Sequence, residues 1–124
     1  FTKEVYDQIG EMNESYFMYL EDVEYSLRMK EKGIRMLMIP EAKLWHKVGS
    51  SSGGEKSKTA IYYGNRNRLL LLKQFNFPFI IRANTLLSRI LLMLKGYLFN
   101  TNEKYIRNSL SDYYSGVAGK KKDL

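Results

Sequence analysis

The segment Gly49–Gly54, which reads Gly-Ser-Ser-Ser-Gly-Gly, most constrains how this chain can fold. It has no apolar side chain to bury, so it predicts a flexible loop between two dissimilar parts. Residues 1–40 carry five basic and eight acidic side chains, whereas residues 41–124 carry fifteen basic and five acidic ones. We therefore divide the chain into an acidic segment, 1–54, and a basic, amphipathic helical region, 55–124.

Local signals predict helices on both sides of this loop. Acidic residues crowd the first turn of a helix that begins near Glu21, where the helix dipole favours anions. We expect its buried stripe to contain Leu20, Val23 and Leu27. Short strands are predicted over 34–39 and 42–46, on either side of Pro40. The other expected helices span 2–9, 58–74, 78–97 and 102–114, and the Lys-rich tail is expected to fray.

The stretch 78–99 is apolar enough to raise the question of a membrane span. Polar and charged side chains interrupt it, and each is costly at mid-bilayer depth: Arg82, Asn84, Arg89 and Lys95. We therefore predict a helix that packs on the domain or lies in the membrane interface, with its cations toward lipid phosphates. Its leucines could also form a self-associating stripe, so a homo-oligomer through the C-terminal helices is possible.

Several short motifs follow one another in a fixed order along the chain. They are Ile9-Gly10, Asn13-Glu14, Phe17-Met18-Tyr19, Glu21-Asp22-Val23, Pro40-Glu41-Ala42, Trp45-His46 and Arg66-Asn67. Their order and spacing resemble the acceptor-side half of family-two inverting glycosyltransferases, in particular the rhamnosyltransferase-like enzymes of bacterial surface-polysaccharide synthesis. The resemblance covers most of residues 4–75. It implies an α/β fold, namely a partial GT-A-type domain with a short strand pair and a helical C-terminal half.

The resemblance implies that Asp22 is the catalytic base. An inverting transfer displaces the leaving group in line at the anomeric carbon, so a carboxylate must take the proton of the attacking acceptor hydroxyl. Glu21 could contact acceptor hydroxyls or stabilise the turn. From spacing alone, both acids are explained as first-turn residues that suit the helix dipole.

His46 resembles the histidine that completes the divalent metal site, for manganese or magnesium, in such enzymes. The other ligands of that site come from an Asp-x-Asp motif, which this chain lacks. One imidazole does not hold a catalytic divalent ion by itself. We therefore expect a metal in the full-length enzyme and none tightly bound to this chain.

The remaining site residues concern the donor diphosphate. The loop 49–54 resembles the mobile segment that closes over it, which implies phosphate contacts for Ser51 and Ser52. On the helix that follows, Arg66 suits a diphosphate through bidentate contacts, and Tyr62, one turn away, could stack on a sugar or base. A plain linker, and buried tyrosines beside a surface arginine, explain the same residues equally well.

These observations predict a part of an enzyme that moves a sugar from a nucleotide-sugar donor to a glycan or lipid-linked acceptor. We expect it to be cytoplasmic, at the inner membrane face, and inactive without a nucleotide-binding half. The alternative is a non-enzymatic basic helical module that binds membrane or nucleic acid. That alternative leaves the Glu21-Asp22 pair and Trp45-His46 unexplained, so we expect no nucleic-acid partner.

Overall fold

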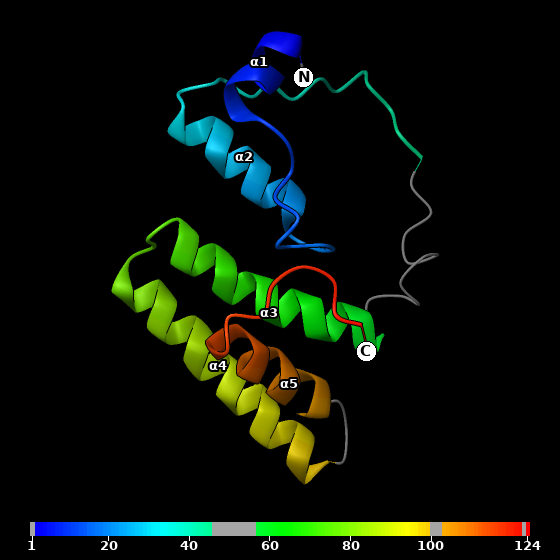
Figure 1. Ribbon diagram of the computed structural model, residues 1–124, viewed down its shortest axis with the longest axis vertical. Coiled ribbons are helices and arrows are strands. Elements are labelled where there is room, and N and C mark those ends of the chain that lie inside the picture. The colour runs from blue at the N-terminus through cyan, green and yellow to red at the C-terminus, as the bar shows by residue number, and fades with distance from the viewer. Residues whose placement is uncertain (1, 46–56, 100–102, 123) are drawn as a thin grey trace.

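The computed structural model describes residues 2–45, 57–99, 103–122 and 124, and within them it contains five helices and no strand. The helices are α1 (Lys3–Ile9), α2 (Glu21–Glu31), α3 (Lys58–Gln74), α4 (Phe79–Leu98) and α5 (Glu103–Tyr114). Figure 1 shows α1 and α2 at one end of the molecule and a bundle of α3, α4 and α5 at the other. The predicted helices are therefore confirmed to within two residues at each end.

Caps explain why the helix boundaries are readable from sequence. The Ser57 hydroxyl accepts a hydrogen bond from the backbone N–H of Ala60, 3.1 Å away, at the start of α3. Pro78 precedes α4, where its missing N–H costs nothing. Gly10 ends α1 with a φ of 78°, which a residue with a Cβ rarely adopts.

The predicted α/β fold is wrong for the described part of the chain. Residues 34–45, where two strands were expected, form no β ladder, and most of their side chains are exposed. Figure 1 shows this segment running away from the end of α2 without a neighbouring strand. A strand requires a partner for its backbone N–H and C=O groups, and the described residues supply none beside it. The apolar pattern of Leu37, Met38 and Ile39 is present, but these side chains are 82%, 89% and 63% exposed.

The core lies mainly along α3, which packs against α5. Buried tyrosines and leucines of α3 accompany the buried Ile106 of α5; they are Tyr62, Tyr63, Leu69, Leu71 and Leu72. α5 also packs against α4, and α1 packs against α2. The bundle is therefore built around α3, and the segment that carries the Glu-Asp pair must be attached to that helix by other contacts.

Two smaller expectations also fail. In α2 the buried residues are Glu24 and Tyr25, whereas Val23 is 39% exposed, so the predicted apolar stripe is wrong. The described part of the C-terminal tail folds back on the protein, where the prediction was that it frays: the backbone N–H of Gly119 donates to the carbonyl of Ser15 over 2.7 Å. In the described residues no helix is long and apolar enough to cross a bilayer, which agrees with the rejection of a span at α4.

Candidate functional site

The turn that precedes α2 holds an unusual backbone conformation. Phe17, Tyr19 and Leu20 have φ values of 59°, 67° and 69°, in the left-handed region that side chains with a Cβ disfavour. Each such residue costs on the order of 1–3 kcal/mol, and persists only where surrounding contacts enforce it. Leu20 is the N-cap residue of α2, so this strained turn sets the position of Glu21 and Asp22.

Asn67 of α3 is the residue that enforces the turn. Its side chain is fully buried, and its Nδ2 lies within hydrogen-bond distance of three carbonyl oxygens. These belong to Tyr16 at 2.7 Å, Met18 at 2.7 Å and Tyr19 at 2.8 Å. The Asn67 amide therefore holds the turn on α3 through three carbonyl groups, of which that of Tyr16 also accepts from the backbone N–H of Met18 at 2.7 Å.

Arg66 is fully buried, and its guanidinium is engaged within the protein. Its Nη1 donates to the carbonyl of Gly119 over 2.8 Å, and its Nη2 to that of Ser15 over 3.1 Å. Its Nε donates to Asn67 Oδ1 over 3.0 Å, and its charge lies 4.8 Å from the ring centre of Tyr63. Arg66 thus joins α3 to both the turn and the tail, and its predicted contact with a donor diphosphate stays a prediction.

Tyr62 is also fully buried, and its hydroxyl donates to Asp112 of α5, which is paired with Lys121 of the tail. Burial and the hydrogen bond to Asp112 raise the pKa of Tyr62 to about 12, although Arg66 acts in the opposite direction. Burial works to raise the pKa of Asp112, but the hydrogen bonds from Lys121 and Tyr62 outweigh it and hold that pKa below its ordinary value. The stacking of Tyr62 on a sugar or base likewise stays a prediction.

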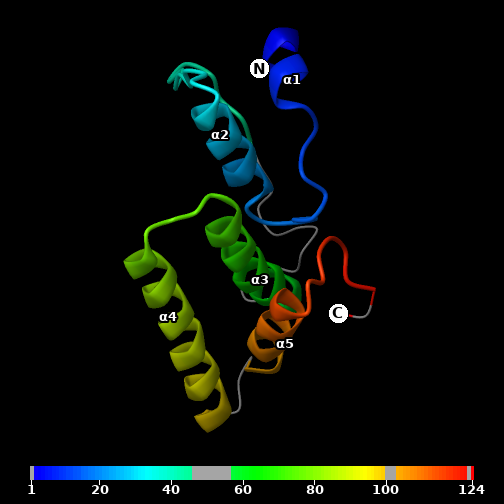
Figure 2. The ribbon, with the colours of Figure 1, turned by 60° about the vertical axis from the view of Figure 1, so that its left-hand side comes forward.

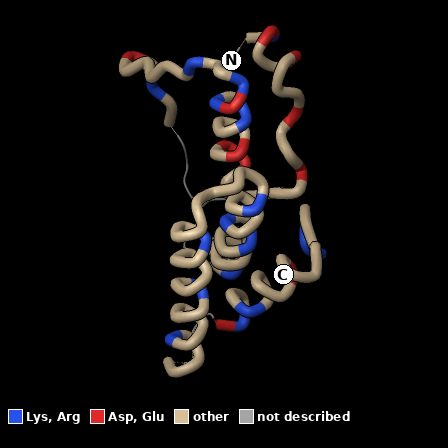
Figure 3. The backbone as a smooth tube through the Cα atoms, turned by 90° about the vertical axis from the view of Figure 1, so that its left-hand side faces the viewer, with Lys and Arg blue, Asp and Glu red and all other residues tan. Residues whose placement is uncertain are grey.

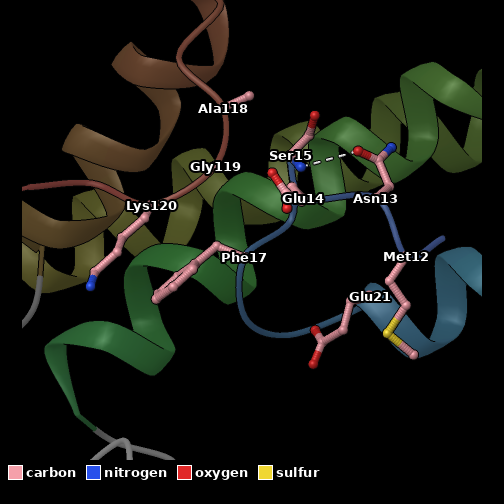
Figure 4. Close-up of a pocket in the computed structure, with 9 residues that line it drawn as sticks. All are labelled: Met12, Asn13, Glu14, Ser15, Phe17, Glu21, Ala118, Gly119 and Lys120. Atoms are coloured by element: carbon pink, nitrogen blue, oxygen red, sulfur yellow. Dashed lines mark hydrogen bonds between the residues drawn. The ribbon is translucent and has the colours of Figure 1, made fainter.

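A groove of about 560 Å³ opens beside the strained turn. Figure 4 shows its lining residues on the loop and the strained turn before α2, on the start of α2 and on the C-terminal tail. It is lined by Met12, Asn13, Glu14, Ser15, Phe17, Glu21, Ala118, Gly119 and Lys120. The Oε2 atom of Glu21 is buried there and has no hydrogen-bond partner among the residues that the structure describes. The groove therefore combines an aromatic ring, an amide, an amine and two carboxylates, which suits a polyhydroxylated ligand.

Asp22 lies in the first turn of α2 and is exposed. Its Oδ1 accepts a hydrogen bond from the backbone N–H of Val23 at 2.8 Å, which fixes the carboxylate at the helix start. Glu24, the third acid of this turn, is instead completely buried. Its carboxylate accepts hydrogen bonds from Gln74 at 2.6 Å and Arg28 at 3.1 Å, so its role is structural.

The metal site suggested by the resemblance is not formed by the residues that the structure places. Between 2 and 45 and in the described parts of 57–124, no three His, Cys, Asp or Glu side chains gather as ligands. His46, Ser51 and Ser52 lie outside the described residues. The predicted roles of these three residues are therefore untested.

Sequence reasoning missed the polar chain that joins the two ends of the molecule. Tyr16 donates to Gln74 at 3.0 Å, Gln74 donates to Glu24, and Arg28 extends the chain to the carbonyl of Ile9 at 2.6 Å. The first two contacts span 58 and 50 positions, which no local pattern reveals. The adjacent pair Arg66-Asn67 signalled a separate set of buried contacts, those to the turn and the tail, because consecutive polar residues inside a helix with apolar neighbours require buried partners.

The chain is similar to two curated proteins that are named as sugar transferases. It is 32% identical over 87 residues to the dTDP-rhamnosyl transferase RfbF of Shigella flexneri, a match that covers 64% of this chain and 29% of that protein. It is 26% identical over 119 residues to the low-salt glycan biosynthesis hexosyltransferase Agl10 of Haloferax volcanii, which covers 94% of this chain and 39% of that protein. The chain thus spans less than two fifths of either relative. No family model and no solved structure matches it.

Proposed function

We propose that this chain forms the acceptor-side part of an inverting glycosyltransferase that uses a nucleotide-sugar donor. The similarity to a rhamnosyl transferase and a hexosyltransferase supports the reaction class. The observation that carries the proposal is the exposed carboxylate of Asp22 in the first turn of α2. It directly follows the strained turn and is adjacent in sequence to Glu21, which lines the polar groove. The acceptor is a glycan or a lipid-linked sugar, and the whole enzyme works at the cytoplasmic face of a membrane.

Asp22 acts as the general base in this proposal. Its carboxylate takes the proton of an acceptor hydroxyl while the hydroxyl oxygen attacks the anomeric carbon of the donor. The new glycosidic C–O bond forms as the C–O bond to the nucleoside diphosphate breaks, and the configuration inverts. The carboxylate of Asp22 lies in the first turn of α2, at the positive end of the helix dipole.

The groove beside Glu21 holds the acceptor sugar. The ring of Phe17 offers an apolar face against which the C–H groups of a pyranose can pack. The buried, unpartnered Oε2 of Glu21 accepts a hydrogen bond from a sugar hydroxyl, which would satisfy an otherwise costly buried oxygen. Glu21 is therefore proposed as an acceptor contact rather than as the base.

Manganese or magnesium would neutralise the leaving diphosphate in the whole enzyme. The described residues do not supply a ligand set for either ion, so we assign no step to it. His46 as a ligand, and Ser51, Ser52, Arg66 and Tyr62 as diphosphate contacts, stay proposals. On this basis the 124-residue chain alone is expected to show neither transfer nor tight binding of manganese or a nucleotide sugar.

The base assignment is tested with Asp22→Asn in a longer enzyme that contains this chain. Turnover should fall by at least about 100-fold, the usual contribution of a general base, while the donor dissociation constant changes by less than about twofold. The matched control is Asp7→Asn, an exposed acid on α1 that should leave both quantities unchanged. Equal turnover of the two variants would remove Asp22 from the base role.

A further inference from the structure

A second groove, of about 600 Å³, lies between α3, α4 and α5, away from the strained turn. Its walls are apolar, with Leu72 from α3, Leu86 and Ile90 from α4, and Tyr113 from α5. Along α4 the groove extends from Phe79 to Ile90, which is about 16 Å at 1.5 Å per residue. It is therefore a long apolar trough, unlike the polar groove beside Glu21.

The helix that forms one wall of this trough is poorly covered. α4 has one buried residue, Gly96, among its twenty, and Figure 2 shows it at the edge of the bundle. Its exposed apolar side chains include Phe79 at 82%, Ile80 at 72% and Leu87 at 54%. A contiguous apolar surface of this kind marks an interaction site.

The charges of this region have a single sign. From Lys56 to Asn102 the sequence contains eight Lys and Arg residues and no Asp or Glu. Figure 3 shows Lys and Arg, but no acidic residue, along α3 and α4. Two of these cations, Lys73 and Arg82, line the trough at the end where α3 connects to α4.

Both cations are available to a ligand. Lys73 and Arg82 are exposed, and the side chain of neither forms a hydrogen bond or ion pair with any residue that the structure describes. By contrast, Arg89 of the same helix as Arg82 donates to Asn65 over 2.9 Å. The trough thus offers a long apolar wall with two unengaged positive charges at one end.

We propose that this trough binds the hydrocarbon chain of a phosphate-headed lipid from an anionic bilayer, with the phosphate at Lys73 and Arg82. Binding of the hydrocarbon chain removes the apolar walls of the trough from water, and the two cations neutralise the phosphate headgroup. A second copy of this chain fits less well, because a symmetric contact through α4 would bring like charges together. The proposal does not depend on the transfer reaction.

Calorimetry on the 124-residue chain tests the trough with soluble probes. Dodecyl phosphate below its micelle concentration should bind at least about tenfold more tightly than inorganic phosphate, because the chain contributes buried area. It should also bind about tenfold more tightly than dodecyltrimethylammonium, which has the same chain and the opposite charge. Equal affinity for the two amphiphiles, or for dodecyl phosphate and inorganic phosphate, would overturn the proposal.

Variants of residues that line the trough test whether dodecyl phosphate binds there. The double change Lys73→Glu with Arg82→Glu should weaken dodecyl phosphate binding at least about tenfold. Ala83→Trp should weaken it too by filling the trough without altering charge. The matched control, Lys104→Glu with Arg107→Glu, reverses two exposed cations of α5 that do not line the trough, and should bind normally. Circular dichroism establishes that each variant is folded, and unchanged binding in both trough variants contradicts the site.

Sedimentation with vesicles tests the bilayer as the source. The chain should sediment with phosphatidylcholine vesicles that contain phosphatidic acid and remain in solution with phosphatidylcholine alone, and added salt should weaken binding. The trough variants should lose this sedimentation. A stable dimer by light scattering that binds neither vesicles nor dodecyl phosphate would assign the α4 face to self-association and end the proposal.

Discussion

The side-chain Nδ2 of Asn67 lies 2.8 Å from the carbonyl oxygen of Tyr19, two residues before the Glu-Asp pair. This contact ties the middle of α3 to the start of α2, although the two residues are 48 positions apart. Because Tyr19 and Leu20 both hold positive φ, loss of this contact should favour a change in the conformation of the turn. The position of Asp22 therefore depends on a side chain that is not hydrogen-bonded to Asp22 and does not line the groove.

Asn67→Asp should destabilise the protein while keeping the size of the side chain. The change removes the N–H donors and places an oxygen opposite the carbonyls of Tyr16, Met18 and Tyr19. Leaving buried groups unpaired costs about 1–3 kcal/mol, so the free energy of unfolding should fall by at least about 2 kcal/mol. Chemical denaturation measures the loss, and amide hydrogen exchange should accelerate in residues 16–20.

Asn84→Asp is the matched control for this change, because Asn84 is exposed on α4. It should alter the free energy of unfolding by less than about 0.5 kcal/mol, as surface substitutions do. If the Asn67 and Asn84 variants were equally stable, the strained turn would not depend on the Asn67 amide.

Glu24→Gln should destabilise the protein, because Glu24 has a structural role, unlike Asp22, the proposed base. The new amide would place a donor against Gln74 or Arg28, which both donate to the present carboxylate. Arg28 keeps its bonds to the carbonyls of Ile9 and Glu11, so we expect a loss of about 2–3 kcal/mol in unfolding free energy.

The exposed Glu31, at the end of α2, supplies the control Glu31→Gln, which should be nearly neutral. Thermal denaturation of both variants makes the comparison. A Glu24 variant as stable as the Glu31 variant would show that the chain from Tyr16 to Arg28 contributes nothing to holding α2 on α3.

The helices were predictable because their signals are local. Ser57, Pro78 and Gly10 mark boundaries that the neighbouring residues alone determine. The strands predicted over 34–39 and 42–46 are absent from the described part of these segments, and their absence was not predictable, because a strand depends on a partner elsewhere in space. Similarly, the spacing of Tyr62 and Arg66 placed both on one face of a helix correctly. It could not reveal that Gly119 folds back to cover Arg66, since that contact spans 53 positions.

Alkaline pH should destabilise the protein through Tyr62. Folding raises the pKa of this phenol from its ordinary value of 10.0 to about 12, so the folded state favours the protonated form. The resulting stabilisation is fully present below about pH 10 and is lost as the pH rises toward about 12. Urea denaturation between about pH 9 and about pH 12 measures it.

Tyr62→Phe should flatten this pH dependence, because the variant has no proton to lose at that position. A residual dependence of stability on pH should remain, because burial and the charge of Glu24 also raise the pKa of Tyr16. Tyr114→Phe serves as the control, since Tyr114 is 67% exposed and should leave the slope as it is in the parent chain. If unfolding free energy depended on pH equally in the two variants, the titration of Tyr62 would not be the cause of the alkaline destabilisation.

Two glycines in helices should respond to alanine in opposite directions. A Cβ at Gly96 would lie 2.8 Å from the Cβ of Glu103 and 3.0 Å from its backbone nitrogen, so α5 would have to move away from α4. Gly96→Ala should therefore lower the free energy of unfolding by about 1–3 kcal/mol, the usual cost of overpacking. A Cβ at Gly64, in the middle of α3, would meet nothing within 4 Å. Gly64→Ala should raise stability by about 0.5–1 kcal/mol through helix propensity alone, and two variants with the same sign would refute the close approach of α4 and α5.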